Sequence, residues 1–379
     1  MKNILITGGA GFIGSHLSWK LINLGFKVTI LDNLSPQIHG DNPEKNSFTL
    51  KSALKAGAHF IEGTVTNKKD WIKALEGQDA VIHLAAETGT GQSMYEIQKY
   101  VDVNIGGTAT FLDLLANNEH TIKKIIVASS RAIYGEGKYT CSIHGYVYPK
   151  ARADADMKKK DFECKCPVCG SALELMATDE DSKIHPTSLY GLTKQAQEEM
   201  VLLMGKSLGI PSVAFRYQNV YGPGQSLSNP YTGILSIFST QIKNNNNLNI
   251  FEDGKESRDF VYIDDVVNAT VLGLIKEEVN FEVFNVGADE PINVLTVAEL
   301  LRKNYNSKIE INISGNYRLG DIRHNYADLT KIKKLLDYTP QFPFEQGIQK
   351  FCNWVNEQEV QEDKYQDSIN EMKLKGLYK

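Results

Sequence analysis

The sequence lacks long apolar runs, has few cysteines and carries no excess of positive charge. No apolar stretch in its 379 residues approaches the length needed to cross a bilayer, so the chain is not predicted to enter a membrane. A net charge of −5 gives no electrostatic reason to expect nucleic-acid binding. The 5 cysteines, an odd number, do not resemble a disulfide framework. A first strand that begins at residue 3 or 4 leaves no room for a signal peptide, so we expect a cytoplasmic protein.

The sequence does contain a glycine-rich turn near its start. Residues 4–14 read ILITGGAGFIG, an apolar run that breaks into glycines just before an amphipathic helical pattern. Gly8 would permit a tight turn, Gly11 would let backbone N–H groups approach phosphates, and Gly14 would let the helix pack close to the strand. A strand, a tight turn and a helix start in this order predict a site for the pyrophosphate of a dinucleotide.

The second predicted strand ends at Asp32, whose carboxylate suits the ribose hydroxyls of adenosine and repels a 2′-phosphate. The next residues, Asn33 and Leu34, are not basic, so NAD is predicted rather than NADP. The predicted cofactor contacts follow the carboxyl ends of the expected strands: Gly8, Gly11, Phe12, Ile13, Gly14, Asp32, Asn33, Thr64, Val65, Leu84, Ala85 and Ala86.

Apolar strand-like segments alternate with helical patterns through the first half of the chain. This alternation predicts an α/β fold, a Rossmann-type doubly wound parallel sheet with helices on both faces and ligands at the carboxyl ends of its strands. Strands are expected at 3–7, 27–32, 58–62, 80–84, 124–128 and 211–216, and helices at 13–24, 68–76, 95–117 and 188–208.

Beyond about residue 218 the segments become shorter and turn residues more frequent. The pattern predicts an NAD-binding domain that carries an insert, and a smaller mixed α/β lobe that binds the substrate. Residues 355–379 are charged with sparse apolar positions, which predicts a solvated C-terminal helix. The expected division is 1–217 for the NAD-binding domain, with the insert at 138–183 and a return of the chain at about 258–290, and 218–257 with 291–379 for the smaller lobe.

Tyr190 and Lys194 stand four positions apart on the helix expected at 188–208, so their side chains share one helix face. A tyrosine is a poor base at neutral pH, but a nearby ammonium group favours the phenolate and lowers its pKa. The same lysine could reach the nicotinamide ribose. A surface pair is the structural alternative, and we favour the catalytic interpretation because a dinucleotide pattern precedes it.

Several motifs in a fixed order resemble the extended short-chain dehydrogenase/reductase family, in its nucleotide-sugar epimerase branch. The resemblance spans nearly the whole chain. The motifs are TGGAGFIG at 7–14, HLAA at 83–86, ASSRAIYG at 128–135, YGLTK at 190–194, RYQNVYGP at 216–223 and RDFVYIDDV at 258–266.

The resemblance implies a role for each matching residue. Tyr190 would be the acid/base on the sugar 4-hydroxyl, Lys194 would tune it and hold NAD, and Ser130 would hydrogen-bond the reacting oxygen. Asn104 would lie near the cofactor, and the resemblance also implies a homodimer. Two guanidinium groups suit a diphosphate because of their fixed donor forks. The expected substrate contacts are Arg131, Asn219, Arg258 and Arg318.

Two positions depart from the family pattern. Thr64 stands where an acidic residue is usual after the third strand, so its contact with adenine is in question. Gln218 replaces an aromatic residue and could alter the sugar subsite.

The residues after Ser130 bear on the type of reaction. Dehydratases of this branch carry an Asp-Glu pair there, whereas this chain has Arg131 and Ala132, which cannot act as that acid/base pair. The resemblance therefore implies a 4-epimerase that oxidises C4 to a 4-keto sugar, returns hydride to the opposite face and retains its NAD.

Further segments at 83–96, 219–233, 251–261 and 317–329 resemble the dTDP-L-rhamnose 4-epimerase subgroup, which makes dTDP-6-deoxy-L-talose. A UDP-hexose or other deoxysugar 4-epimerase is the nearest alternative, because a few side chains can change sugar preference. A dehydratase, a reductase and a noncatalytic NAD-binding regulator rank lower.

The segment between Ser130 and Tyr190 is far longer than a crossover needs, and it contains paired ligand residues. Cys141 and His144 form one pair and Cys166 and Cys169 the other, each with two intervening residues, as in a zinc knuckle. These residues predict a closed structural zinc site, and Cys164 is a rival for the place of His144. The mixed charges of the insert favour a local brace beside the active site or a subunit contact.

Overall fold

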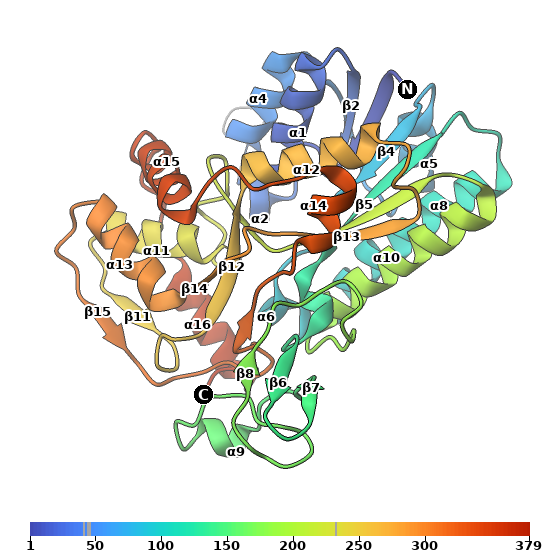
Figure 1. Ribbon diagram of the computed structural model, residues 1–379. Helices are drawn as coiled ribbons and strands as arrows, with labels where there is room; N and C mark the ends of the chain where they lie inside the picture. The colour runs from blue at the N-terminus through green and yellow to red at the C-terminus, as the bar shows by residue number, and fades with distance from the viewer. Residues whose placement is uncertain (41, 44–46, 232) are drawn as a thin grey trace.

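The computed structural model describes residues 1–40, 42–43, 47–231 and 233–379. Its centre is a seven-stranded sheet with the strand order β13-β9-β5-β4-β1-β2-β3, and all neighbouring strands are parallel (Figure 1). The predicted Rossmann-type sheet is therefore confirmed, and every strand expected from the sequence belongs to it. The strands are β1 (Asn3–Thr7), β2 (Lys27–Asp32), β3 (His59–Glu62), β4 (Ala80–His83), β5 (Lys124–Ser130), β9 (Ser212–Tyr217) and β13 (Glu282–Val286).

Helices cover both faces of this sheet (Figure 1). One face packs against α1 (Phe12–Asn23), α4 (Phe48–Ala56) and α12 (Ile263–Ile275), and the other against α5 (Lys68–Leu75), α8 (Gly107–Asn117) and α10 (Leu189–Leu208). Ile4 and Ile6 of β1 lie in the hydrophobic core of the first face, and Leu5 lies in that of the second. Burial on both faces explains why the strands are almost continuously apolar. Ligands are then left with the carboxyl edge of the sheet.

The helix expected at 95–117 is divided into three parts. It begins as α7 (Ile97–Tyr100), continues as the π-helical segment η1 (Val101–Gly106) and ends as α8. Asn104 lies within the π-helical part and is fully buried. Such interruptions are frequent at functional sites.

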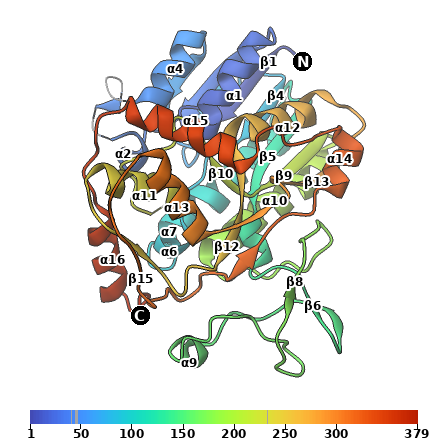
Figure 2. The same cartoon turned by 60° about the vertical axis from the view of Figure 1, so that its left-hand side comes forward.

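A second layer of structure lies at the carboxyl edge of the large sheet (Figure 2). Strand β12 belongs to this layer, whereas α12 and β13, which follow it, return to the large sheet. The predicted domain boundaries stay a prediction. The second layer contains the sheet β10 (Asn219–Tyr221), β12 (Ser257–Tyr262), β14 (Pro291–Asn293) and β16 (His324–Asn325), the pair β11 (Leu248–Ile250) and β15 (Ile311–Ile313), and the helices α11 (Ile234–Lys243), α13 (Val294–Asn304) and α15 (Phe344–Asn356).

The C-terminal helix is present as α16 (Tyr365–Leu374), but it is not fully solvated. Ile369 and Met372 are buried, and backbone hydrogen bonds join Tyr317 to Lys379. The expectation of a solvated helix is wrong because one narrow apolar face packs onto the protein. Within the described residues, no helix has both the length and the apolar character to cross a membrane.

The insert forms a small unit that projects from the main body in both views (Figures 1 and 2). Its three-stranded antiparallel sheet has the order β7-β6-β8. The described residues also form several short elements. In the insert they are β6 (Tyr139–Cys141), β7 (Gly145–Val147), α9 (Asp154–Met157) and β8 (Glu174–Leu175), and elsewhere α2 (Pro36–His39), α6 (Thr90–Ser93), the 3₁₀ turn η2 (Arg131–Tyr134) and α14 (Thr330–Leu336).

Candidate active site

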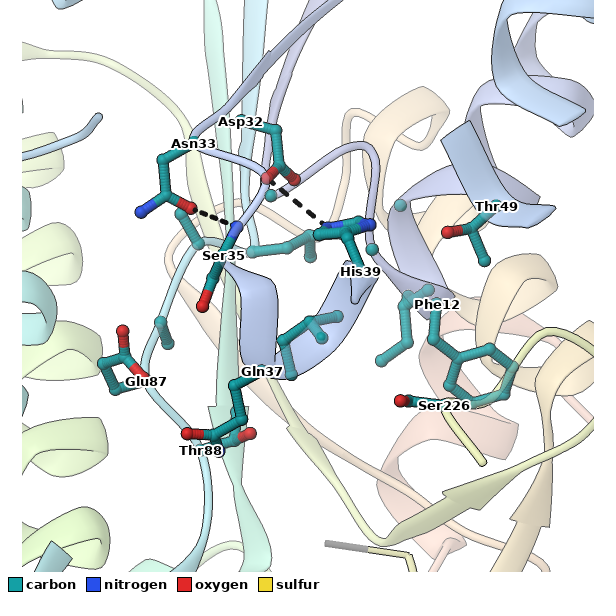
Figure 3. Close-up of a pocket in the computed structure, with 18 of the residues that line it drawn as sticks. Phe12, Asp32, Asn33, Ser35, Gln37, His39, Thr49, Glu87, Thr88 and Ser226 are labelled. Atoms are coloured by element: carbon teal, nitrogen blue, oxygen red, sulfur yellow. Dashed lines mark hydrogen bonds and ion pairs between the residues drawn. The ribbon is translucent and has the colours of Figure 1, made fainter. Parts of the chain in front are cut away.

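Two adjoining cavities open at the carboxyl edge of the large sheet. The first cavity, of about 300 Å³, lies beside the glycine-rich turn (Figure 3). Its volume is within the range of small-molecule sites. It brings together twelve of the residues predicted to bind the cofactor: Gly8, Gly11, Phe12, Ile13, Gly14, Asp32, Asn33, Thr64, Val65, Leu84, Ala85 and Ala86.

The glycines of this turn are required by close backbone contacts. Gly8 has a φ of +68°, and a Cβ there would lie 2.9 Å from the backbone nitrogen of Ala85. At Gly14 a Cβ would lie 2.5 Å from the carbonyl oxygen of Gly8. A side chain at Gly14 would therefore push α1 away from the turn. With glycine at this position, α1 begins next to the first cavity, and its first backbone N–H groups are available to a phosphate.

Asp32 ends β2 and is largely buried in the first cavity. Its carboxylate accepts hydrogen bonds from the backbone N–H groups of Ala10 (3.1 Å) and Leu34 (2.9 Å). It lies 3.7 Å from the ring of His39, whose pKa is lowered by burial (Figure 3). These bonds fix the carboxylate on the wall of the cavity, and its expected contact with ribose hydroxyls stays a prediction.

Asn104 and Lys194 lie below the two cavities and line neither of them. The Asn104 side chain joins the backbone of Glu87 to the hydroxyl of Thr193 by hydrogen bonds of 2.7 to 3.1 Å. The Lys194 ammonium donates to Gln197 Oε1 at 2.7 Å, and burial lowers its pKa to about 7. The cofactor contacts expected of both residues stay predictions.

The second cavity, of about 410 Å³, shares Phe12, Ile13, Thr88 and Gln225 with the first. The two cavities therefore adjoin, so one ligand can meet the other at their junction. The second cavity brings together these residues predicted for catalysis and substrate binding: Ser130, Arg131, Tyr190, Asn219, Arg258 and Arg318.

Tyr190, the second residue of α10, lies on the wall of the second cavity. Burial raises its pKa, while a hydrogen bond with Ser130 and the positive charge of Arg131 lower it. Lys194, one helical turn after Tyr190 and bonded to Gln197, keeps its expected tuning role as a prediction. Arg131 is a second cation whose charge lowers this pKa.

Three arginines give the second cavity its positive groups. Arg131 donates from Nε to Asn219 Oδ1 at 2.7 Å. Arg258 donates to the carbonyl oxygens of Ile322 and Arg323 at 2.7 and 2.9 Å. Arg318 pairs with the carboxylate of Asp321. These bonds hold the guanidinium groups in place before any anion binds.

Gln218, which the sequence connected with the sugar subsite, lines the second cavity, whereas several other lining residues were not identified from the sequence. Gln218 is 5% exposed, and neither of its amide atoms has a hydrogen-bond partner within the described part of the chain. Its departure from the family pattern was the available signal. The following lie on short loops or distant segments, where no local pattern reveals them: Ser35, Gln37, His39 and Ser226 in the first cavity, and Tyr231, Phe251, Asp321 and Tyr365 in the second.

A separate cluster in the insert contains Cys141, His144, Cys166 and Cys169, whose ligand atoms all lie within 4.8 Å of one another. The sulfurs of Cys141 and Cys169 are 3.8 Å apart, and His144 Nδ1 lies 3.6 Å from the sulfurs of Cys141 and Cys166. Cys164 is buried elsewhere, among Tyr139, Glu136 and Arg152, and does not belong to the cluster. The geometry agrees with the predicted ligand set and does not by itself show a metal.

The parallel sheet, the glycine turn and the tyrosine on the wall of the second cavity define the chain as a Rossmann enzyme of the dinucleotide-dependent type. A model of the NAD dependent epimerase/dehydratase family matches residues 4–151 and 166–287. The chain belongs to this family, and the prediction of an NAD-dependent nucleotide-sugar epimerase is confirmed at that level.

The chain is similar to individual members of the family. It is 35% identical to a dTDP-L-rhamnose 4-epimerase of Burkholderia thailandensis, over 93% of this chain and 95% of that protein. A UDP-glucuronic acid 4-epimerase from Bacillus cereus, solved with UDP-glucuronic acid and NAD, superposes with a TM-score of 0.75 at 28% identity, covering 93% and 99% of the chains. A UDP-N-acetylglucosamine 4-epimerase from Methanobrevibacter ruminantium gives a TM-score of 0.74 at 28% identity, covering 94% and 99%.

Proposed function

We propose that this chain is an NAD-dependent 4-epimerase that interconverts dTDP-L-rhamnose and dTDP-6-deoxy-L-talose. The observation that carries the reaction type is the position of Tyr190, on the wall of the cavity that adjoins the one beside the glycine turn. A sugar in the second cavity can then meet a nicotinamide that extends from the first. The residues of the first cavity fit NAD, because the glycines admit a pyrophosphate and Asp32 suits the adenosine ribose.

NAD, held by the glycine turn and Asp32, would supply the acceptor and donor of hydride for C4 of the sugar. Tyr190 takes the proton of the 4-hydroxyl and gives it back to the same oxygen after the sugar has rotated in the site. Ser130 hydrogen-bonds that oxygen, and Arg131 keeps the phenolate form of Tyr190 accessible by its positive charge. Arg258 and Arg318 bind the diphosphate, whose attachment would let the sugar rotate without leaving the site.

The choice of sugar and nucleotide rests on the 35% identity with the Burkholderia protein. UDP-hexose and other deoxysugar 4-epimerases are the alternatives, since UDP-sugar epimerases are also among the similar structures. Incubation of the protein with dTDP-L-rhamnose, UDP-glucose and UDP-glucuronic acid, followed by NMR of the C4 configuration, separates them. Inversion of a UDP-sugar alone would reject the proposed substrate but keep the reaction type.

A label at C4 tests the reaction type itself. With C4-deuterated substrate, the proposal expects the deuterium to stay on C4 through inversion, because hydride passes to the bound cofactor and back. Loss of deuterium to water would mean that the carbon is deprotonated instead, and the proposed role of NAD would fall.

The insert is proposed to bind one structural zinc ion through Cys141, His144, Cys166 and Cys169. Zinc–sulfur bonds of about 2.3 Å in a tetrahedron place two sulfurs about 3.8 Å apart, which agrees with the 3.8 Å between Cys141 and Cys169. Four ligands would leave no open position, so the ion would stabilise the insert without acting on the substrate.

The homodimer and the two-lobe division stay predictions.

Elemental analysis of the purified protein should find about one equivalent of zinc, as one closed site requires. Cys166→Ser should lose the metal, whereas Cys164→Ser should keep it, because Cys164 lies outside the cluster. A folded and fully active protein without metal would contradict the zinc proposal. Loss of zinc in Cys164→Ser with retention in His144→Gln would favour the four-cysteine alternative.

A further inference from the structure

Residues 318–323 form part of the wall of the second cavity, and their backbone is hydrogen-bonded both by a cavity residue and by the insert. Toward the cavity, Arg258 donates to the carbonyl oxygens of Ile322 and Arg323, and the Asp321 carboxylate holds Arg318. The position of both arginines therefore depends on the backbone of residues 321–323.

On its other side, the same backbone is held by an arginine of the insert. Arg152 donates from Nη2 to the carbonyl oxygen of Asp321 at 2.9 Å. Its guanidinium also binds both carboxylate oxygens of Glu252 at 2.8 Å and the carbonyl oxygen of Phe162 at 3.1 Å. The Arg152 side chain is only 4% exposed, so these bonds lie in a dry environment where they are strong and specific.

Arg323 forms the second connection between the insert and this segment. Its side chain is fully buried and pairs with Glu163 of the insert at 2.5 Å. It also pairs with Glu252 at 2.9 Å and with Asp253 at 2.7 Å. Glu252 is thus shared between Arg152 and Arg323, which makes one ion-pair network of the insert and the second layer.

The Glu136 carboxylate also belongs to the network and contacts residues 318–323. Glu136 Oε2 accepts the backbone N–H of Arg323 at 2.7 Å, and Glu136 Oε1 lies 3.4 Å from Arg152 Nε. Both neighbours of Ile322 are therefore held by groups that do not line the cavity. Asp321 is held through its carbonyl oxygen by Arg152, and Arg323 through its N–H by Glu136 and through its side chain by Glu163 and Asp253.

We infer that the insert is a positioning element for the nucleotide diphosphate, acting through Arg152 and Glu163 on the backbone that orients Arg258 and Arg318. Both insert residues lie in 152–165, the stretch that the family model leaves unmatched between its two segments. They touch neither cavity, so they act through the arginines rather than on the substrate. The inference rests on the proposed assignment of Arg258 and Arg318 to the diphosphate.

The main test is Arg152→Lys, with binding of dTDP and of UDP measured by calorimetry on the NAD-containing protein. Lysine keeps a positive charge beside the buried Glu136 and Glu252, but it cannot donate to Asp321 and Glu252 in the same planar geometry. We expect the affinity for the nucleotide that the wild type binds to fall about tenfold and KM for the sugar nucleotide to rise equally. The kcat should stay within about twofold, because Tyr190 and Ser130 are untouched.

Glu163→Gln is the second variant, since Glu163 is half-exposed and its loss leaves Arg323 paired with Glu252 and Asp253. Its effect should have the same direction and be smaller. Asp161→Asn is the matched control, because the Asp161 ion pair with Lys165 stays within the insert. This control should bind nucleotide as the wild type does.

Wild-type affinity and KM in both variants would overturn the inference while leaving the proposed function intact. A wild type that binds neither dTDP nor UDP would overturn the diphosphate assignment, and the inference with it. If Arg152→Lys fails to fold or loses NAD, Glu163→Gln decides. An equal fall of kcat and of thermal stability without a change in nucleotide affinity would mean that the network is merely structural.

Discussion

The first cavity is lined mainly by short loops that directly follow β1, β2, β3 and β4, whereas the second cavity takes its walls from segments that are far apart in the chain. Tyr190 and Tyr365 are far apart in the sequence and line the same cavity only in the folded protein. The first cavity depends on backbone geometry, which local sequence encodes. The second depends on side chains that other side chains hold in place, and such a site can change its ligand by a few substitutions.

The largest expected effect is a loss of turnover in the second cavity while the first cavity keeps its NAD. Tyr190→Phe removes the proposed acid/base, so kcat should fall by about 10² to 10⁴-fold. The NAD content, read from the absorbance of the denatured supernatant, should not change, because Tyr190 does not line the first cavity. Tyr146→Phe, at an exposed position of the insert, is the control. Retained turnover in Tyr190→Phe would reject the assignment.

The opposite result should follow from a change in the first cavity. Gly14→Ala places a Cβ 2.5 Å from the carbonyl oxygen of Gly8, so α1 must shift away from the turn. We expect NAD to be lost and the free energy of unfolding to fall by about 1 to 3 kcal/mol, as in other overpacked sites. Gly106→Ala, where the nearest atom is 3.8 Å away, should keep both. An unchanged NAD content in Gly14→Ala would refute the assigned role of this turn.

A smaller effect concerns the pH dependence of the second cavity. Because the charge of Arg131 lowers the pKa of Tyr190, Arg131→Leu should raise that pKa. In the proposed mechanism the phenolate is the active base, so the acidic limb of the kcat profile should move to higher pH, and activity below that limb should fall. Arg131→Lys keeps the charge and should restore most of the wild-type profile. A leucine variant with an unshifted limb would show that another group tunes Tyr190.

The smallest effect should be one of sugar preference. Gln218 is buried on the wall of the second cavity, and neither of its amide atoms has a partner among the described residues, so a bound sugar hydroxyl could satisfy it. Gln218→Phe introduces the aromatic residue usual in the family and should raise KM for the native sugar by a few-fold to about tenfold. The dTDP affinity should not change. An unaltered KM would place Gln218 outside the sugar subsite.

The cysteine cluster shows how far local sequence can predict a site. Cys141 and His144 flank a tight turn between β6 and β7, and Gly170, with a φ of +73°, follows Cys169 in the second turn. Two local turns that each hold a ligand pair restrict the possible geometry, and the structure placed His144 in the cluster rather than Cys164. Sequence spacing alone could not decide whether His144 or Cys164 is the fourth member of the cluster. In the folded chain Cys164 is buried beside Tyr139, away from the other ligand atoms.

The sequence alone determined the parallel sheet, the glycine turn, the place of Asp32 and the shared face of Tyr190 and Lys194, since each follows from the spacing of neighbouring residues. Only the folded chain shows that Arg131 lies close enough to Tyr190 to lower its pKa, how the C-terminal helix packs, and that Arg152 of the insert holds the carbonyl oxygen of Asp321. Those contacts join residues that are distant in sequence. Local periodicity does not predict them, because the pairing of buried charges depends on how the whole chain folds.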